Sequence, residues 1–268
     1  MNLERSWLFC PADRPERFDR ALASGADRVV LDLEDAVLPE AKTGARAGLA
    51  AWLDGAAPGA VVVRINAAGT PWHVDDVAAL AGRKGLAGIM LPKAENPDVL
   101  AGLRARLAPD AVLVALVESL RGLADLRRVA SAPGLRRLAF GSVDFCLEAG
   151  IRGYAEELNA VRTQLVVESA LAGIGAPIEG VTVALKDPVM LTADVDRARR
   201  FGFAGKLCVH PAQVEAVNRG FSPSEAEIGW ARRVVEACAI GGGAIVVDGK
   251  LVDRPVRLQA EVILAAVA

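Results

Sequence analysis

The seven apolar residues Ala111-Val-Leu-Val-Ala-Leu-Val117 are followed at once by an acid, Glu118. A continuous apolar run of this length, rich in valine, is typical of a strand that is buried on both faces of a parallel sheet. A second run, Leu138-Ala-Phe-Gly141, precedes Asp144 in the same way. If both runs are parallel strands, the two carboxylates share the rim on which α/β enzymes place their chemistry, so an enzyme is the leading interpretation.

Runs of this kind recur along the chain. The eight runs cover residues 7–10, 28–33, 60–65, 86–91, 111–117, 136–140, 180–185 and 205–209. Helix-like stretches lie between them, as in residues 156–172, where Leu158, Val161 and Leu165 recur at helical spacing. Eight strands that alternate with helices predict an α/β protein, a TIM (β/α)8 barrel over residues 1–220.

A C-terminal segment follows the eighth run. Residues 221–225, Phe-Ser-Pro-Ser-Glu, resemble a helix start with a serine cap, and a helix is expected over residues 225–239. The triple glycine 241–243 is a candidate hinge, and Asp248-Gly249 between two apolar runs predicts a β-hairpin. With a final helix, these elements predict a helix-hairpin-helix extension over residues 221–268.

The composition limits the classes of function. The chain has 268 residues, of which 53% are hydrophobic, and one barrel of about 250 residues with an appendage is the economical arrangement. The net charge is -2 and the pI about 5.8, so no basic field is available for a nucleic acid or an anionic membrane. No apolar run approaches the roughly 20 residues of a membrane-spanning helix, and the N-terminus lacks signal-peptide flanks. We expect a cytoplasmic protein whose four scattered cysteines are reduced and mostly buried.

Acids gather at the predicted strand ends. Glu118 and Asp144 follow the fifth and sixth runs, and Asp32, Glu34 and Asp35 follow the second. Magnesium takes one or two carboxylates and completes its shell with water and substrate oxygens, so acids from adjacent strands suffice. Acids at strand ends also cap the following helices or pair with buried arginines. The residues alone leave metal binding and capping open.

Arg64 ends the otherwise apolar strand of Val61-Val-Val-Arg-Ile-Asn66. An unpaired charge there is costly, so the guanidinium needs a carboxylate partner or an anionic ligand. Its planar fork suits a substrate carboxylate, and a fixed salt bridge to Glu34 or Asp35 is the alternative. Lys93, after the fourth run, is a weaker candidate because an exposed lysine gives the same pattern.

Three arginines follow the first run. The segment Pro11-Ala-Asp-Arg-Pro-Glu-Arg-Phe18 predicts a helix start that places Arg14, Arg17 and Arg20 where a phosphate group can dock. An ordinary solvated helix face is the alternative for these side chains.

Two histidines are present. His210 ends the eighth run and is a candidate substrate contact through its imidazole or its backbone, whereas His73 fits a loop or a helix start. No Ser-His-Asp order and no reactive-cysteine context are evident, which disfavours an acyl-enzyme mechanism.

Eight motifs follow one another in a specific order from one end of the chain to the other. They are Arg5-Ser-Trp-Leu-Phe-Cys-Pro11, Asp32-Leu-Glu-Asp-Ala-Val37, Arg64-Ile-Asn66, Leu91-Pro-Lys-Ala-Glu95, Leu116-Val-Glu118, Phe140-Gly-Ser-Val-Asp144, Gly205-Lys-Leu-Cys-Val-His-Pro211 and Asp248-Gly-Lys-Leu-Val-Asp253. Each motif is weak alone. Together the chain resembles the citrate lyase beta-subunit-like branch of the HpcH/HpaI aldolase and malyl-CoA lyase superfamily.

The resemblance implies a magnesium-dependent barrel that acts on short hydroxyacyl-CoA thioesters. It implies that Glu118 and Asp144 are the metal ligands and that Arg64 contacts the substrate carboxylate during catalysis. The residues expected to hold the substrate are Arg64, Glu118, Phe9, Val209 and His210. The residues expected to hold CoA are Arg14, Arg17 and Arg20.

The family reaction is reversible carbon-carbon cleavage, in which the hydroxyl is deprotonated and the neighbouring bond breaks to give a 2-oxo acid and a thioester enolate. In related lyases, an aspartate of the C-terminal segment reaches a neighbouring subunit's site and handles the proton on the enolate carbon. Asp253 is the matching position, and a turn aspartate before the final helix is the alternative. The resemblance therefore implies that residues 221–268 form a lid that contributes to a neighbouring subunit's site in a homo-oligomer, with a trimer favoured.

We expect a magnesium-dependent lyase that cleaves citryl-CoA, citramalyl-CoA or malyl-CoA into an acyl-CoA and a 2-oxo acid. The acyl group rides on CoA or on an acyl-carrier protein, and neither a nucleic acid nor a membrane is an expected partner. Two alternatives stay open: a metal-dependent pyruvate-type aldolase on CoA-free substrates, and a catalytically weak binding or scaffold subunit.

Overall fold

The computed structural model describes residues 4–240 and 245–267, and eight parallel strands form its main sheet. The strands are β1 (Ser6–Pro11), β2 (Arg28–Asp32), β3 (Val61–Arg64), β4 (Leu86–Leu91), β5 (Val112–Val117), β6 (Arg137–Phe140), β7 (Gly175–Ile178) and β8 (Lys206–Cys208). Strands pair in chain order, and β8 returns to β1. A single parallel bridge from Glu179 to Lys206 joins the β7 and β8 sides. The predicted TIM barrel is confirmed.

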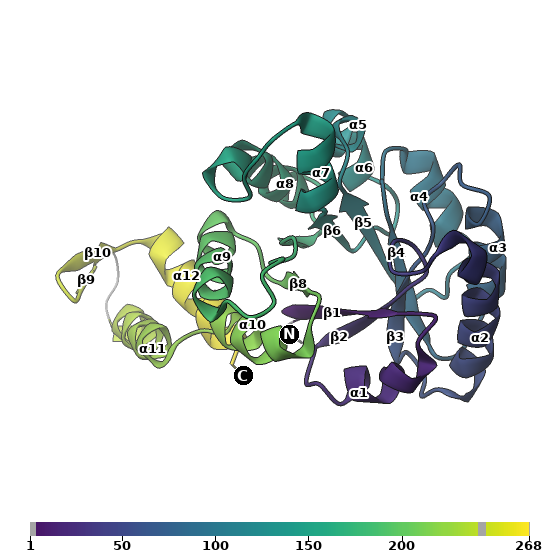
Figure 1. The fold of residues 1–268 in the computed structure, drawn as a ribbon. Coiled ribbons are helices and arrows are strands. Elements are labelled where there is room, and N and C mark those ends of the chain that lie inside the picture. The colour runs from purple at the N-terminus through teal and green to yellow at the C-terminus, as the bar shows by residue number, and fades with distance from the viewer. Residues whose placement is uncertain (1–3, 241–244, 268) are drawn as a thin grey trace. The chain divides into compact units, whose positions relative to one another are not determined.

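Helices lie outside these strands, as α2, α3 and α4 show in Figure 1. The helices between the strands are η1 (Pro15–Arg17), α1 (Phe18–Leu22), η2 (Pro39–Ala41), α2 (Lys42–Gly55), α3 (His73–Leu80), α4 (Pro97–Arg104), α5 (Leu120–Ala124), α6 (Leu126–Ala130), α7 (Ser142–Ala149), η3 (Glu156–Leu158), α8 (Asn159–Leu171) and α9 (Pro188–Phe201). Those after β8 are η4 (Pro211–Gln213) and α10 (Val214–Phe221). Neighbours pack on one another, α2 on α3 and α8 on α9. The predicted helix at residues 156–172 is confirmed as η3 and α8.

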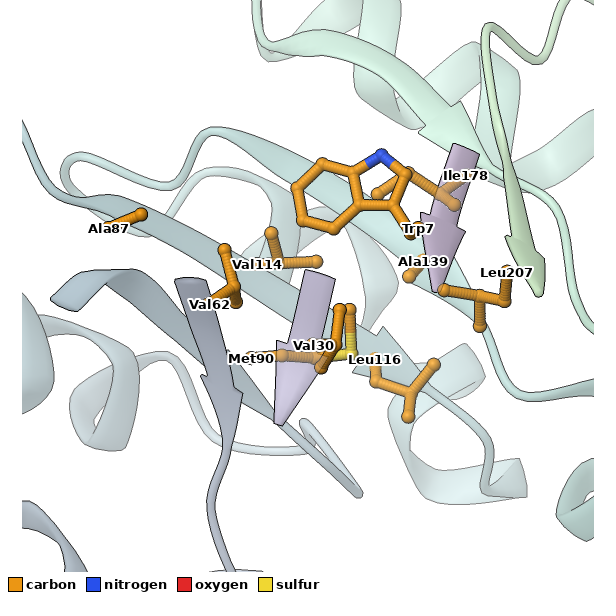
Figure 2. Packing of buried hydrophobic residues seen from close by; sticks show 10 residues of the cluster. All are labelled: Trp7, Val30, Val62, Ala87, Met90, Val114, Leu116, Ala139, Ile178 and Leu207. Atoms are coloured by element: carbon orange, nitrogen blue, oxygen red, sulfur yellow. The ribbon is translucent and has the colours of Figure 1, made fainter. Parts of the chain in front are cut away.

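The barrel interior is a packed core (Figure 2). Successive strand residues point to opposite faces, so Val114 and Leu116 of β5 both point inward. The cluster comprises Trp7, Val30, Val62, Ala87, Met90, Val114, Leu116, Ala139, Ile178 and Leu207. Because side chains fill the barrel, a ligand has access only at the ends of the strands.

The seventh strand lies earlier than the sequence predicts. The apolar pattern predicts it at residues 180–185, but β7 is Gly175–Ile178, and residues 180–184 have no regular structure. Pro177 cannot donate to a ladder, so a run that contains it is a poor match to the pattern of a central strand. The register of β6 with β7 shifts between Arg137 and Ala139, and Pro177 lies within this irregular stretch.

The chain divides into two compact units, of which residues 4–218 form the barrel unit. The second unit, from residue 219, contains α11 (Glu225–Ile240), an antiparallel hairpin of β9 (Ile245–Val247) and β10 (Lys250–Val252), and α12 (Arg254–Ala265). The predicted helix-hairpin-helix order is confirmed.

Local signals account for the second unit. Ser224 Oγ accepts a hydrogen bond from the Glu227 amide, and Glu227 Oε2 accepts one from the Ser224 amide, which is a capping box at the start of α11. Asp248 and Gly249 take φ values of 50° and 75° in the predicted hairpin turn. The candidate hinge at residues 241–243 lies outside the described residues. Within the described ranges, no helix has both the length and the apolar character needed to cross a membrane.

Candidate active site

A cavity of about 400 Å³ opens at the carboxyl ends of the barrel strands. It is lined by Phe9, Pro11, Asp32, Asp35, Ala36, Arg64, Leu116, Glu118, Phe140, Gly141, Ser142, Val143, Asp144, Val181, Leu207 and Val209. Most of these side chains are apolar, and the charged ones are four acids and one arginine. A largely apolar cleft with a few convergent charged groups is the usual form of a small-molecule site.

Glu118 directly follows β5 and is almost fully buried. Its Oε1 accepts a hydrogen bond from the backbone N–H of Lys93 at 2.9 Å. Burial, reinforced by the nearby charge of Glu34, raises the pKa of Glu118 to about 8. The next helix, α5, is capped by Ser119, whose Oγ accepts from the Gly122 amide at 3.1 Å. Glu118 therefore does not cap a helix.

Gly141 provides the space for the Glu118 carboxylate. A Cβ at position 141 would lie 2.4 Å from Glu118 Oε2 and 2.3 Å from Glu118 Cβ. Any side chain at residue 141 would therefore displace the acid.

Asp144 lies in the first turn of α7 and lines the same cavity. No side chain caps α7, whose N-cap residue is Gly141. The Lys93 ammonium is 3.6 Å from Glu118 Oε1 and 3.8 Å from Asp144 Oδ2, so one cation contacts both carboxylates. The segments that follow two adjacent strands, β5 and β6, thus bring the two predicted metal ligands together.

The donor set fits magnesium. Among the described residues, no group of three or more His, Cys, Asp and Glu side chains is arranged to hold a metal. A zinc site would need three or four protein ligands, whereas magnesium is held by one or two carboxylates together with water and substrate oxygens. Glu118 and Asp144, which line the same cavity, match that smaller set of carboxylates.

Arg64 ends β3 and lines the cavity with its guanidinium largely buried. Its Nε and Nη2 donate to the two carboxylate oxygens of Asp32 at 2.7 and 2.6 Å. Nη1 is 3.0 Å from Glu34 and 3.4 Å from Asp35, the two partners that the sequence suggests. The ring of Phe9 packs 4.8 Å from the guanidinium carbon. The fixed salt bridge is present, and its main partner is Asp32.

The sequence reasoning missed Asp32 as this partner, although a signal was available. Asp32 and Arg64 are the last residues of β2 and β3, and they are direct neighbours in the register of the two strands. An acid and an arginine that each end adjacent parallel strands are placed to pair.

Lys42 is a second residue that the sequence reasoning missed. Its buried ammonium donates to the carbonyl oxygens of Leu33 at 2.8 Å and Glu34 at 2.6 Å, and so holds the loop after β2. The available signal was its place on α2, because Lys42, Ala45 and Leu49 share the buried face of that helix.

Two of the remaining predicted substrate contacts lie at the cavity and one does not. Phe9 and Val209 line it. His210 is exposed and is not among the lining residues, and its Nδ1 accepts from the Ala212 amide at 3.2 Å, which caps η4. His73 begins α3, as predicted, and its Nδ1 lies 2.9 Å from the Asn66 carbonyl oxygen.

Arg14, Arg17 and Arg20 are exposed around η1 and α1. Arg14 and Arg17 lie 3.9 Å from acids that adjoin them in the chain, Asp13 and Glu16. Long pairs of this kind at the surface leave the guanidinium groups open to an anionic ligand.

Asp253 lies in the second unit, at the N-cap of α12. Its Oδ1 accepts a hydrogen bond from the Val256 amide at 3.2 Å. The capping alternative is therefore present, and a catalytic role for Asp253 stays a prediction.

Comparison with known proteins identifies the family. The family model described as HpcH/HpaI aldolase/citrate lyase matches residues 5–211. The chain belongs to this family. A citrate lyase subunit beta-like protein of Mycobacterium tuberculosis is 37% identical over 275 residues, which cover 98% of this chain and 97% of the relative. A (3S)-malyl-CoA thioesterase of Cereibacter sphaeroides is 37% identical over 258 residues, 93% of this chain and 90% of that protein.

A solved structure shows that the similarity includes the fold of this chain. It is the M. tuberculosis protein CitE in complex with magnesium, acetoacetate and coenzyme A. The TM-score is 0.86 at 34% sequence identity, and the match covers 98% of each chain.

Proposed function

We propose that this family member is a magnesium-dependent lyase that cleaves a short 3-hydroxyacyl-CoA into an acyl-CoA and a 2-oxo acid. The observation that carries the proposal is the meeting of Glu118, Asp144 and Arg64 on one apolar-walled cavity at the carboxyl ends of the strands. Citrate lyase-like relatives, and a related structure with magnesium and coenzyme A, support the same function. Citryl-CoA, citramalyl-CoA and malyl-CoA are the candidate substrates.

Glu118 and Asp144 are the residues that would hold the magnesium ion. When bound there, the ion supplies positive charge for the oxygens of the 2-oxo acid as the carbon-carbon bond breaks. Glu118 must be ionised to serve as a ligand, and Asp144 lines the same cavity.

Arg64 would orient the substrate carboxylate through its positive charge. Asp32 fixes the guanidinium from one side and the Phe9 ring packs on its face, so its direction is set before the substrate arrives. The apolar walls restrict water around the reacting bond, which strengthens the charge interactions inside. Those walls include Leu116, Phe140 and Val181.

The remaining parts of the proposal come from the resemblance. Arg14, Arg17 and Arg20 would meet the phosphates of CoA, and Asp253 would handle the proton on the enolate carbon in a neighbouring subunit's site. His210 would contact the substrate only through its backbone, since its imidazole caps η4. Assembly into a homo-oligomer, a trimer in particular, and a cytoplasmic location stay predictions.

Thioester hydrolysis is the second candidate function. Its support is the 37% identity to a (3S)-malyl-CoA thioesterase over 93% of this chain. The two reactions use the same substrate and differ in products. A lyase releases an acyl-CoA and a 2-oxo acid, whereas a thioesterase releases free CoA and a hydroxy acid.

The test is to incubate the protein with citryl-, citramalyl- and malyl-CoA in the presence of magnesium and to identify the products by mass spectrometry. We expect an acyl-CoA and a 2-oxo acid from at least one substrate. Glu118→Gln keeps the shape of the side chain and removes its charge, so turnover should fall on the order of 100-fold to 1,000-fold. Glu40→Gln, at an exposed acid of η2, is the matched control.

Each other outcome points elsewhere. Free CoA and a hydroxy acid as the products favour the thioesterase. Turnover of 4-hydroxy-2-oxo acids without CoA favours a pyruvate-type aldolase. Equal turnover by wild type and Glu118→Gln contradicts the metal assignment, and no turnover of any of these substrates favours a binding or scaffold subunit.

A further inference from the structure

Lys93 has a strained backbone that places it against the candidate metal ligands. Among the described residues other than glycine, only Lys93 and Asp248 have positive φ, and Asp248 belongs to a hairpin turn. Lys93 takes φ of 46° just after β4, in the left-handed region that a residue with a Cβ rarely adopts. Strain of this kind is kept where the surroundings require it, often at a functional site.

The strained conformation directs both ends of Lys93 at the same acids. The backbone N–H donates to Glu118 Oε1 at 2.9 Å. The ammonium lies 3.1 Å from Glu34 Oε1, 3.6 Å from Glu118 Oε1 and 3.8 Å from Asp144 Oδ2. Lys93 is thus a cation within reach of three carboxylates, two of which are the proposed magnesium ligands.

Without a cation, these three acids would repel one another in a partly buried place. Glu34 and Glu118 are largely shielded from solvent, so their repulsion is only weakly screened. The Lys93 side chain is 44% exposed, so its long stem can move the ammonium toward solvent without unpacking the core.

We propose that Lys93 is a built-in competitor of magnesium, a tethered cation that shares the carboxylates of Glu118 and Asp144 with the ion and weakens its binding. The inference rests on the proposed function, because it concerns the same metal site. Magnesium binding then displaces the ammonium from the two ligands, and the site releases and regains the ion more readily than two acids alone would allow. Glu34 retains the displaced ammonium, since it is the closest of the three acids.

The test measures magnesium binding itself, by calorimetric titration of the protein with magnesium chloride alone. Lys93→Met keeps the backbone donor to Glu118 and most of the length of the unbranched side chain but removes the charge. We expect its dissociation constant for magnesium to fall on the order of tenfold, because a unit charge no longer competes at contact distance. Lys93→Arg keeps the charge and should remain close to wild type.

Lys84→Met is the matched control. Lys84 is exposed just before β4, at the opposite end of the barrel from the cavity, and its loss changes the net charge by the same amount. We expect this variant to bind magnesium as wild type does. Should Lys93→Met fold poorly by circular dichroism, Lys93→Gly removes the same charge and also relieves the positive φ.

The outcomes separate this inference from the proposed function. Wild-type binding of magnesium with an unchanged or weaker affinity in both Lys93→Met and Lys93→Gly overturns the inference alone. An equal gain in affinity in Lys84→Met also overturns it, because the effect is then one of net charge. A wild-type protein that binds no magnesium overturns the proposed function, and the inference with it.

Discussion

The fold disfavours the ionised form of Glu118 at neutral pH. Burial and the neighbouring Glu34 raise its pKa to about 8, and the compensating groups, Lys93 and Arg64, do not cancel this effect. The protein's own positive charges therefore do not fully stabilise the ionised form of Glu118. A divalent cation at the carboxylate would supply the missing charge, so proton and metal compete for the same oxygens.

The pH dependence of magnesium binding follows from this competition. Below pH 8 the ion must displace a proton from Glu118, so its affinity should fall by up to about tenfold for each pH unit, and it should level off above pH 8. Calorimetric titrations with magnesium at pH 6.5, 7.5 and 8.5 measure this directly. An affinity that is constant over this range would contradict the raised pKa of Glu118.

The same pKa has a consequence for stability, whose sign is opposite to that of an ordinary salt-bridged acid. The pKa of Glu118 is higher in the folded state than the ordinary glutamate value of 4.5, so the folded protein holds the proton more tightly. This contribution to the free energy of unfolding is complete below about pH 4.5 and is lost as pH rises through about 8. Urea unfolding of the magnesium-free wild type and of Glu118→Gln, each at several pH values, measures this contribution. It is the difference between the two proteins in how the free energy of unfolding changes with pH.

Side-chain positions at the site were partly predictable from sequence. Glu118, Asp144 and Arg64 follow or end their strands, and parallel strands end at a common rim, so their proximity was expected. The contacts of Lys42 and Lys93 were not, since they depend on where a flexible side chain reaches after the chain has folded. Lys93 meets Glu34 across 59 residues of sequence, and no local pattern records that contact.

The strands follow the hydrophobic pattern at most places in the chain. Seven of the eight predicted runs correspond to strands, because apolar residues in the barrel wall are buried on both faces. The pattern failed at β7, where glycine and proline occupy strand positions and the following Val181-Thr-Val183 imitates a strand. Hydrophobicity alone cannot distinguish such a segment from a strand. Which of the two segments becomes the strand depends on which one forms backbone hydrogen bonds with the neighbouring strands.

A buried ion pair supports the junction of β7 with β8. Arg162 Nε donates to Glu179 Oε2 at 2.7 Å, and both side chains are nearly inaccessible. Glu179 also forms the bridge to Lys206 that closes the barrel. Loss of the Glu179 charge would leave the Arg162 guanidinium buried without a carboxylate to balance its charge.

We therefore expect Glu179→Gln to lower the free energy of unfolding by about 3 to 5 kcal/mol. Urea denaturation followed by circular dichroism measures this change. Glu261→Gln removes a carboxylate from an exposed pair with Arg257 on α12 and should leave the urea midpoint unchanged. Equal midpoints for wild type and Glu179→Gln would show that the pair does not stabilise the junction.

The second unit of the protein carries a candidate catalytic residue that also has a structural task. Asp253 caps α12, so a change to alanine would mix loss of a cap with loss of a carboxylate. Asparagine caps helices as well as aspartate does. Asp253→Asn therefore removes the charge and keeps the cap.

We expect Asp253→Asn to retain the melting temperature of wild type and to lose most of its turnover. If Asp253 serves a neighbouring subunit, co-expression of Asp253→Asn with Glu118→Gln should restore part of the activity, because mixed oligomers contain sites with both acids intact. Turnover of the co-expressed pair that stays at the level of the single variants would contradict action between subunits. Full activity of Asp253→Asn alone would remove Asp253 from the mechanism.

The position of the bound metal decides whether the proposed lyase site is correct. Crystals can be grown with pyruvate and with manganese as a substitute for magnesium. The anomalous scattering of manganese then marks the metal position directly in an anomalous difference map. We expect one peak within about 2.3 Å of oxygens of both Glu118 and Asp144, with pyruvate oxygens and water completing the coordination. A peak at other residues, or full pyruvate occupancy with no metal beside these two carboxylates, would contradict the assignment.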